Sequence, residues 1–127
     1  MSVIPSDLKY TASHEWIKEE NGLWIVGLTD FAQSELGDIV FAELPEEGDS
    51  VTAGESFSNV ESVKAVSEVF SPVTGIVAQV NTALIDEPGL INAAPYDNWL
   101  IKVKDATAFA DLLDGQQYAD VCSKEGA

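Results

Sequence analysis

The sequence of 127 residues contains no arginine, one histidine and one cysteine. A single cysteine cannot form an internal disulfide, which is in keeping with a reducing compartment. A single histidine excludes a histidine-rich metal site, and the chain has no Cys-x-x-Cys pair and no glycine-rich phosphate loop. His14 could serve a Ser-His-Asp triad, but no Gly-x-Ser-x-Gly nucleophile motif accompanies it. We therefore expect no metal site and no nucleophilic catalytic machinery.

Positive charge is also scarce. Six lysines stand against 22 acidic residues, which gives a formal net charge of −16. Such a chain repels phosphate backbones and anionic lipids, so we expect it to bind neither nucleic acid nor membranes. Protein partners with basic surfaces are favoured instead. The many carboxylates leave a paired-carboxylate active site open, although most of them are expected to serve solubility.

Signals for export or membrane insertion are lacking as well. No apolar run reaches the roughly 20 residues that a transmembrane helix needs. The opening residues, MSVIPSDLKY, have neither the basic nor the apolar region of a signal peptide, and they lack the arginine-rich character of a transit sequence. We expect a cytoplasmic, bacterial-type protein, and a processed organelle protein stays open.

The chain does contain many short strand-like runs separated by turns, a pattern typical of an all-β barrel or sandwich. Asn21-Gly22 lies between two such runs and predicts a hairpin, because both residues accept positive φ. Thr29 or Asp30 can cap a helix of about two turns, to about residue 36, which Gly37 would end. The runs that predict strands are 15–19, 23–28, 39–44, 57–61, 65–70, 76–80 and 99–103, with a turn at 72–75.

The tail carries two amphipathic patterns and predicts two C-terminal helices that cover the sandwich as a lid. The apolar residues at i, i+3 and i+4 are Phe109, Leu112 and Leu113 in the first and Tyr118, Val121 and Cys122 in the second. We expect one domain over 1–127, with a core at about 8–104 and a helical segment at about 105–123.

Lys64 is isolated, because no other lysine lies between Glu19 and Ile101. A lysine in a β-hairpin is most often a solvated charge that protects a sheet edge. Three features favour a function instead. Its neighbours Val63 and Ala65 are apolar, it lies between two strand-like runs and so at an accessible turn, and a modifying enzyme would meet only one amine there.

Several motifs follow one another in fixed order. They are YTASHEW at 10–16, GLTD at 27–30, LGDIVF at 36–41, ELPE at 43–46, ESVKA at 61–65, SPVTG at 71–75, LIN at 90–92 and PY at 95–96, followed by Trp99. Together they resemble the glycine cleavage system H-protein family over about Leu8 to Tyr118. Phe31, Glu68 and Asn98 depart from residues common in that family, and none of the three affects the carrier role.

The resemblance implies a lipoyl-domain-like barrel-sandwich hybrid, mainly β, with two packed antiparallel sheets related by a pseudo-twofold. It implies a non-catalytic carrier with (R)-lipoate in amide linkage to Lys64. The rest of the lipoylation motif would be Glu61, Ser62, Val63 and Ala65. The arm would take the aminomethyl group of glycine from the P-protein (glycine dehydrogenase, decarboxylating) to the T-protein (aminomethyltransferase), and the L-protein, dihydrolipoamide dehydrogenase, would reoxidise it.

Further partners implied by the resemblance are the enzymes that attach lipoate, namely a lipoate ligase, or an octanoyltransferase with lipoyl synthase. We expect a monomer. Ser13 and Glu15, with Glu68 near the root of the arm, would hold the ammonium group of the cargo and shield it from hydrolysis. The plain alternative for Glu15 is an exposed strand charge.

Other carriers fit less well. A lipoyl domain of a 2-oxoacid dehydrogenase usually has Asp before the lysine, where Val63 stands. A biotin carrier usually has methionines beside it, and Met1 is the only methionine here. A lipoyl-relay protein, which donates lipoate to other enzymes, would use the same Lys64 and stays open. A scaffold that binds partners through its acidic face, without modification, also stays open.

Overall fold

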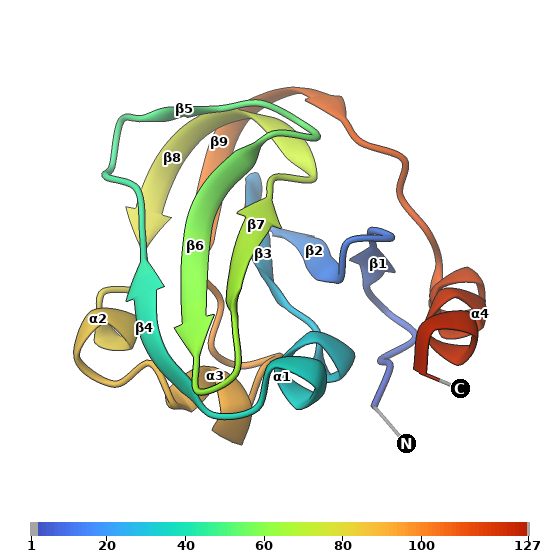
Figure 1. Ribbon diagram of the computed structural model, residues 1–127. Helices are drawn as coiled ribbons and strands as arrows, with labels where there is room; N and C mark the ends of the chain where they lie inside the picture. Colours follow the sequence, from blue (N-terminus) through green and yellow to red (C-terminus); the bar gives the residue numbers. More distant parts are fainter. Residues whose placement is uncertain (1–2, 127) are drawn as a thin grey trace.

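The protein, a computed structural model that describes residues 3–126, is built from two antiparallel sheets (Figure 1). One sheet has six strands in the order β1-β2-β3-β9-β8-β5, and the other has three in the order β4-β6-β7. The strands are β1 (Lys9–Tyr10), β2 (Glu15–Glu20), β3 (Leu23–Leu28), β4 (Ile39–Glu43), β5 (Ser50–Val51), β6 (Ser56–Ser62), β7 (Val66–Phe70), β8 (Val73–Val80) and β9 (Ile101–Phe109). The predicted mainly β architecture of two antiparallel sheets is confirmed. The pseudo-twofold relation between them stays a prediction.

Four helices lie in the connections and at the end of the described chain. They are α1 (Asp30–Leu36), α2 (Ala83–Asp86), α3 (Leu90–Ala93) and α4 (Gly115–Gly126). The predicted helix near 29–36 is confirmed: the Thr29 hydroxyl accepts a hydrogen bond from Ala32 N at 3.1 Å, and Gly37 follows with a φ of 77°. Within the described residues, no helix is long and apolar enough to cross a membrane.

The β2–β3 hairpin forms where Asn21-Gly22 predicts it. Asn21 and Gly22 have φ values of 55° and 81°, so both central residues of the turn lie in the left-handed region that this tight hairpin turn requires. The register then pairs Glu20 with Leu23 and continues to Glu15 with Leu28. This register places Glu15 at the first position of β2, where its side chain can contact other elements.

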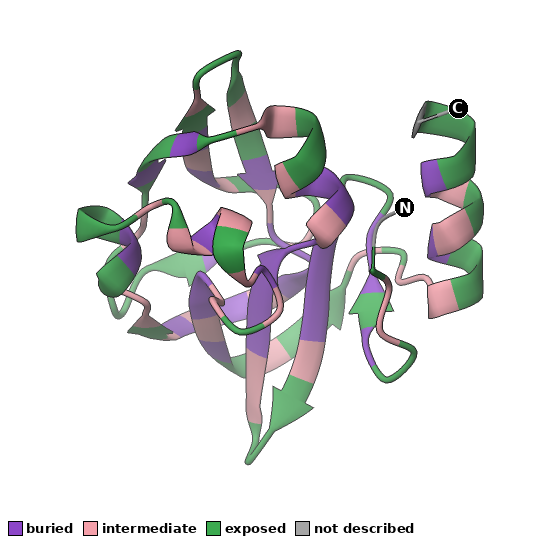
Figure 2. Ribbon diagram, turned by 90° about the horizontal axis from the view of Figure 1, so that it is seen from below, coloured by how far each residue is buried: buried purple, intermediate pink, exposed green. Residues whose placement is uncertain are grey.

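Two apolar clusters lie on opposite faces of the large sheet. The main core fills the space between the two sheets, and Figure 2 shows the buried residues gathered there. Its members include Ile17, Val26, Val60, Val69, Val77, Ile101 and Val103. The second cluster lies on the other side of β1–β3 and joins them to α1 and α4 through Leu8, Tyr10, Trp16, Ile25, Phe31, Tyr118 and Cys122.

The first of the two predicted C-terminal helices is wrong. Strand β9 continues to Phe109, where it pairs with Val73 of β8, and the Phe109 ring packs against Trp24 with centroids 4.8 Å apart. The three residues that suggested a helical face therefore contact three different places. Leu112 packs against the main core, and Leu113 pairs with Tyr10.

The second predicted helix is correct in kind and longer than expected. Asp114 caps α4, because its Oδ1 accepts a hydrogen bond from Gln117 N at 2.8 Å.

The prediction of a turn over 72–75 is wrong from Val73 onward, because strand β8 begins at Val73. Strands β1 and β5 and helices α2 and α3 were not predicted. The tail covers the outer face of β1–β3 with one helix, beside the sandwich in Figure 1.

Candidate functional site

Lys64 lies at the tip of the β6–β7 hairpin and is exposed. The turn is closed by Ser62, whose backbone N–H donates to Ala65 O at 2.8 Å. The Ser62 hydroxyl oxygen also accepts hydrogen bonds from the backbone N–H groups of Lys64 and Ala65, each at 3.1 Å. A serine at this position therefore gives the lysine a fixed backbone, as serine often does in turns.

The tip is also bound to the loop that follows α1. The backbone N–H of Val63 donates to Asp38 O at 3.0 Å. A β-carbon added to Gly37 would lie 3.5 Å from Lys64 Cε, so the aliphatic stem of the lysine runs across this glycine. The root of the side chain is thus supported, while its amine end belongs to an exposed residue.

Asn92 of α3 fixes the same loop through hydrogen bonds of its side chain. Its Nδ2 donates to Gly37 O at 2.8 Å and to Gln33 Oε1 at 2.9 Å, and its Oδ1 accepts from Ile39 N at 2.9 Å. One side chain therefore ties α1, the loop and β4 together. The role of Asn92 could not be read from its place in the LIN motif, because its partners lie more than 50 positions away.

Four exposed apolar side chains lie in the hairpin tip and on the strands that flank β6, and we call them the apolar collar. They are Val40 and Phe41 on β4, Val63 next to Lys64, and Val66 at the start of β7, with exposed fractions of 55, 46, 66 and 67 %. Large apolar side chains this exposed mark contact sites when they gather in one place. The exposed acids near the collar are Glu35, Asp38, Glu43, Glu61 and Glu68. Of the predicted motif, Glu61 pairs with Phe41 and Val66 and so lies within the collar.

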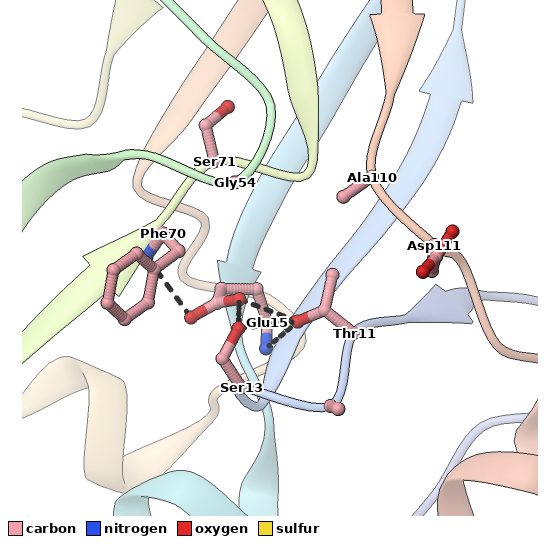
Figure 3. A pocket seen from close by; sticks show the side chains of 9 residues that line it. Thr11, Ser13, Glu15, Gly54, Phe70, Ser71, Ala110 and Asp111 are labelled. Atoms are coloured by element: carbon pink, nitrogen blue, oxygen red, sulfur yellow. Dashed lines mark hydrogen bonds between the residues drawn. The ribbon is translucent and has the colours of Figure 1, made fainter.

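Glu15 is buried, with 1 % of its surface exposed, so the alternative of an exposed strand charge is wrong. Its Oε1 accepts hydrogen bonds from the hydroxyls of Thr11, at 2.6 Å, and Ser13, and its Oε2 accepts from Phe70 N at 3.2 Å (Figure 3). Burial raises the pKa of Glu15 from its ordinary 4.5 to about 7, against the opposing effect of these donors. The structure thus brings Ser13 and Glu15 together, as predicted.

A cavity of about 390 Å³ opens beside this carboxyl group. Figure 3 shows Glu15, Ser13 and Thr11 converging on one side of it, with Ala110 and Asp111 opposite. The complete lining is Thr11, Ala12, Ser13, Glu15, Gly54, Phe70, Ser71, Ala110 and Asp111. A buried carboxylate among hydroxyl groups in an open cavity can accept hydrogen bonds from a small cationic group.

Strand β7 connects the two places. Its first residue, Val66, lies two positions after Lys64, and its last, Phe70, contacts Glu15. Four residue steps along a strand rise roughly 13 Å. Glu68 lies between them on β7, exposed and paired with Asn59, and it is not among the residues that line the cavity. The structure therefore brings Ser13 and Glu15 together but does not bring Glu68 to them.

A small antiparallel sandwich that presents one lysine on a closed, supported β-turn is the architecture of a carrier domain with a prosthetic arm. The sequence matches the family model described as glycine cleavage H-protein over residues 8–125. It is 57 % identical over 119 residues to the glycine cleavage system H protein of Listeria innocua, covering 91 % of this chain and 94 % of that one.

Two further comparisons agree. The glycine cleavage system H protein of Carboxydothermus hydrogenoformans is 49 % identical over 129 residues, with 99 % of each chain covered. The crystal structure of a glycine cleavage system H protein from Mycobacterium marinum superposes with a TM-score of 0.88 at 43 % identity, covering 98 % of this chain and 100 % of that one. The chain belongs to the glycine cleavage H-protein family, the non-catalytic lipoyl-lysine carriers of the glycine cleavage system.

Proposed function

We propose that Lys64 is the residue that bears lipoate and that the chain carries the aminomethyl group of glycine from the P-protein to the T-protein. Support comes from an exposed amine on a closed turn within the ESVKA motif. When bound, lipoate supplies the sulfur that takes up and yields this group and that the L-protein reoxidises. The protein supplies position and electrostatics.

The surroundings of two other lysines differ from those of Lys64. Lys18 makes an ion pair with Glu20 at 3.2 Å, and the ammonium of Lys102 lies 4.8 Å from the centre of the Trp99 ring. Lys64 has instead an exposed tip within the apolar collar. Selection of one amine among six requires recognition of its surroundings, and the exposed apolar side chains of the collar offer such a surface.

The collar and the exposed acids near it serve as the docking face for the enzymes that attach lipoate, a lipoate ligase or an octanoyltransferase with lipoyl synthase. Those enzymes meet the chain before any arm exists, so they must recognise the protein surface itself. A surface of exposed apolar side chains, with Glu61 among them and further acids nearby, is complementary to an apolar recess that carries lysine and arginine. The P-, T- and L-proteins would approach the same end of the molecule to reach the arm.

Ser13 and Glu15 receive the cargo. The ammonium group of the aminomethyl cargo needs acceptors, and an ionised Glu15 beside the Ser13 hydroxyl offers them out of bulk water. Such a site would slow hydrolysis of the cargo. Glu68, on β7 between the two sites, is an exposed acid near the root of the arm.

The chain acts as one carrier domain and as a cytoplasmic monomer. A mass of two chains in analytical ultracentrifugation would contradict the monomer.

Intact-mass analysis tests the assignment of Lys64. Protein purified from lipoate-replete cells should carry a lipoyl adduct, and Lys64→Arg should carry none. An adduct that persists in Lys64→Arg would move the arm to another lysine, and a wild type without any adduct would favour the unmodified scaffold. Reconstitution of glycine cleavage with the three enzymes then separates the carrier from a lipoyl relay, which would not support turnover.

A further inference from the structure

His14 has an unusual backbone. It stands between Ser13 and Glu15, and its φ of 75° lies in the left-handed region, which is unfavourable for a residue with a β-carbon. Such a conformation persists only where the surrounding structure enforces it. The turn closes around this residue: His14 N donates to Thr11 O at 3.1 Å, and Thr11 N donates to Glu15 O at 3.0 Å. Whatever holds His14 therefore holds the residues that bind Glu15.

Helix α4, more than 100 positions away in sequence, holds the His14 ring. The Nδ1 atom of His14 lies 2.7 Å from the hydroxyl of Tyr118, and the Nε2 atom of His14 lies 2.9 Å from a carboxylate oxygen of Glu125. The ring also packs against Phe31 of α1, with centroids 4.8 Å apart. Three side chains from two helices thus fix the position of one histidine.

The direction of these hydrogen bonds follows from their partners. A carboxylate only accepts, so Nε2 of His14 donates to Glu125. In the neutral ring Nδ1 then accepts from the hydroxyl of Tyr118, and that hydroxyl accepts in turn from Thr29 Oγ1 at 2.6 Å. The backbone N–H of Thr29 donates back to His14 O at 3.1 Å. Tyr118 therefore closes a ring of bonds that joins the turn to the start of α1.

We infer that Tyr118 is a positioning residue for the Ser13–Glu15 site. It acts through His14, whose left-handed backbone sets where the Thr11 and Ser13 hydroxyls meet the Glu15 carboxyl group. The C-terminal helix is then part of the cargo site, although α4 contributes no residue to the cavity lining. The inference deepens the proposed function, since it rests on the role given there to Glu15.

The chain contains a matched control for this hydroxyl. Tyr10 stacks on Tyr118 with centroids 4.6 Å apart and planes 8° apart, and both side chains are fully buried. The Tyr10 hydroxyl donates to Pro5 O and does not contact His14. Tyr118→Phe and Tyr10→Phe therefore each remove one buried hydroxyl from the same stacked pair, and only the first touches the turn.

The first readout uses the unmodified protein and follows the Glu15 carboxyl carbon by NMR titration. In Tyr118→Phe the midpoint should rise above that of the wild type, because the Ser13 and Thr11 donors that lower it are no longer held in place. In Tyr10→Phe it should stay at the wild-type value. Equal midpoints in both variants would overturn the inference, since a general loss of stability would affect the two alike.

The second readout is ammonia release from lipoylated protein loaded with the aminomethyl cargo. Tyr118→Phe should release it about three to ten times faster than Tyr10→Phe, the range expected for one lost hydrogen bond. Glu15→Gln separates the two claims. If Glu15→Gln releases ammonia no faster than wild type, the proposed cargo role fails, while a shifted titration in Tyr118→Phe would still establish positioning.

If Tyr118→Phe does not fold, Glu125→Ala replaces it. The Glu125 side chain is 50 % exposed, so its loss removes the acceptor of His14 Nε2 without opening the core. Lys124→Ala, the exposed neighbour on α4, is its control. A raised Glu15 midpoint in Glu125→Ala and an unchanged one in Lys124→Ala would support the inference, and identical midpoints would overturn it.

Discussion

The two ends of strand β7 differ in almost every physical property. At one end Lys64 is exposed on a turn whose bonds are mostly local, between Ser62 and Ala65. At the other end Glu15 is 1 % exposed and is bound by groups up to 55 positions away. A swinging arm needs a fixed root in open solvent, and a reactive cargo needs a polar recess with little water. One strand connects these two environments.

The difference also separates what local sequence can specify from what only the fold provides. The Lys64 turn is formed by four consecutive residues with a serine at its start. The Glu15 site needs the Thr11 turn, the end of β7 and the segment at Asp111 to meet. The predictions that follow test each end of β7 in turn, from the largest expected effect to the smallest.

Lys64→Arg should abolish glycine cleavage. Arginine keeps the charge but cannot form the amide bond with lipoate, so the reconstituted system with the P-, T- and L-proteins should release carbon dioxide from glycine only at background rate. Circular dichroism should be unchanged, because the side chain is exposed. Turnover above background in this variant would place the arm elsewhere.

Glu15 should make the stability of the fold depend on pH. Its pKa is raised from 4.5 to about 7 by burial, so between these values the folded state holds a proton that the unfolded state has lost. Stability therefore falls as pH rises through this window. The loss is about 3 kcal/mol and is complete above pH 7.

Urea unfolding of wild type and Glu15→Gln at pH 4 and pH 8 checks this sign. The wild type should lose about 3 kcal/mol more than the variant between the two values, since the other carboxylates are common to both chains. Parallel changes in the two proteins would show that Glu15 titrates normally and is not desolvated. Asp111 also lines the cavity, but it is the same residue in wild type and in Glu15→Gln, so it does not account for a difference between the two proteins.

Much of the fold was predictable because its signals are local. Asn21-Gly22 and the pair Thr29 and Gly37 specify a hairpin and a helix through conformations that these residues favour. The false helix at 109–113 arose because a spacing of i, i+3, i+4 also occurs in an extended chain whose side chains meet separate partners. Only the pairing of β9 with β8 decides between the two, and that pairing is not local.

The candidate site divides in the same way. Lys64, Ser13 and Glu15 could be proposed from motifs that carry the family resemblance, and the isolation of Lys64 is visible in the sequence alone. The hydrogen bond from Phe70 N to Glu15 and the hydrogen bond between Tyr118 and His14 could not be predicted, because each joins segments that meet only in the folded chain. Burial of Glu15 follows from the same packing.

The collar should matter for attachment of lipoate. Val66→Asp replaces one of its apolar side chains with a charge and should lower kcat/KM for the attaching enzyme about tenfold, the effect of losing a moderate interface contact. Ile85→Asp is the matched control, because Ile85 is 55 % exposed but lies on α2. Equal rates for the two variants would exclude the collar as the docking face.

Gly37→Ala should have the smallest effect on the carrier function. Its φ of 77° with a ψ of −158° lies in a region that essentially only glycine occupies, so unfolding by urea should show a loss of about 1 to 3 kcal/mol. The added carbon would lie 3.5 Å from Lys64 Cε, an ordinary contact, so the lipoyl adduct should still form. Gly89→Ala, where φ is −62° and no neighbour lies within 4 Å, should cost nothing. A Gly37→Ala protein as stable as Gly89→Ala would contradict the strained loop.

The connection between the two ends of β7 is tested most directly by one titration, that of the Glu15 carboxyl carbon in unmodified, lipoylated and cargo-loaded protein. A midpoint near 7 is expected in the unmodified chain. An ammonium group held beside the carboxylate favours its charged form, so the midpoint should fall in the loaded protein alone. The same midpoint in all three forms would mean that the arm rooted at Lys64 does not deliver its cargo to Glu15.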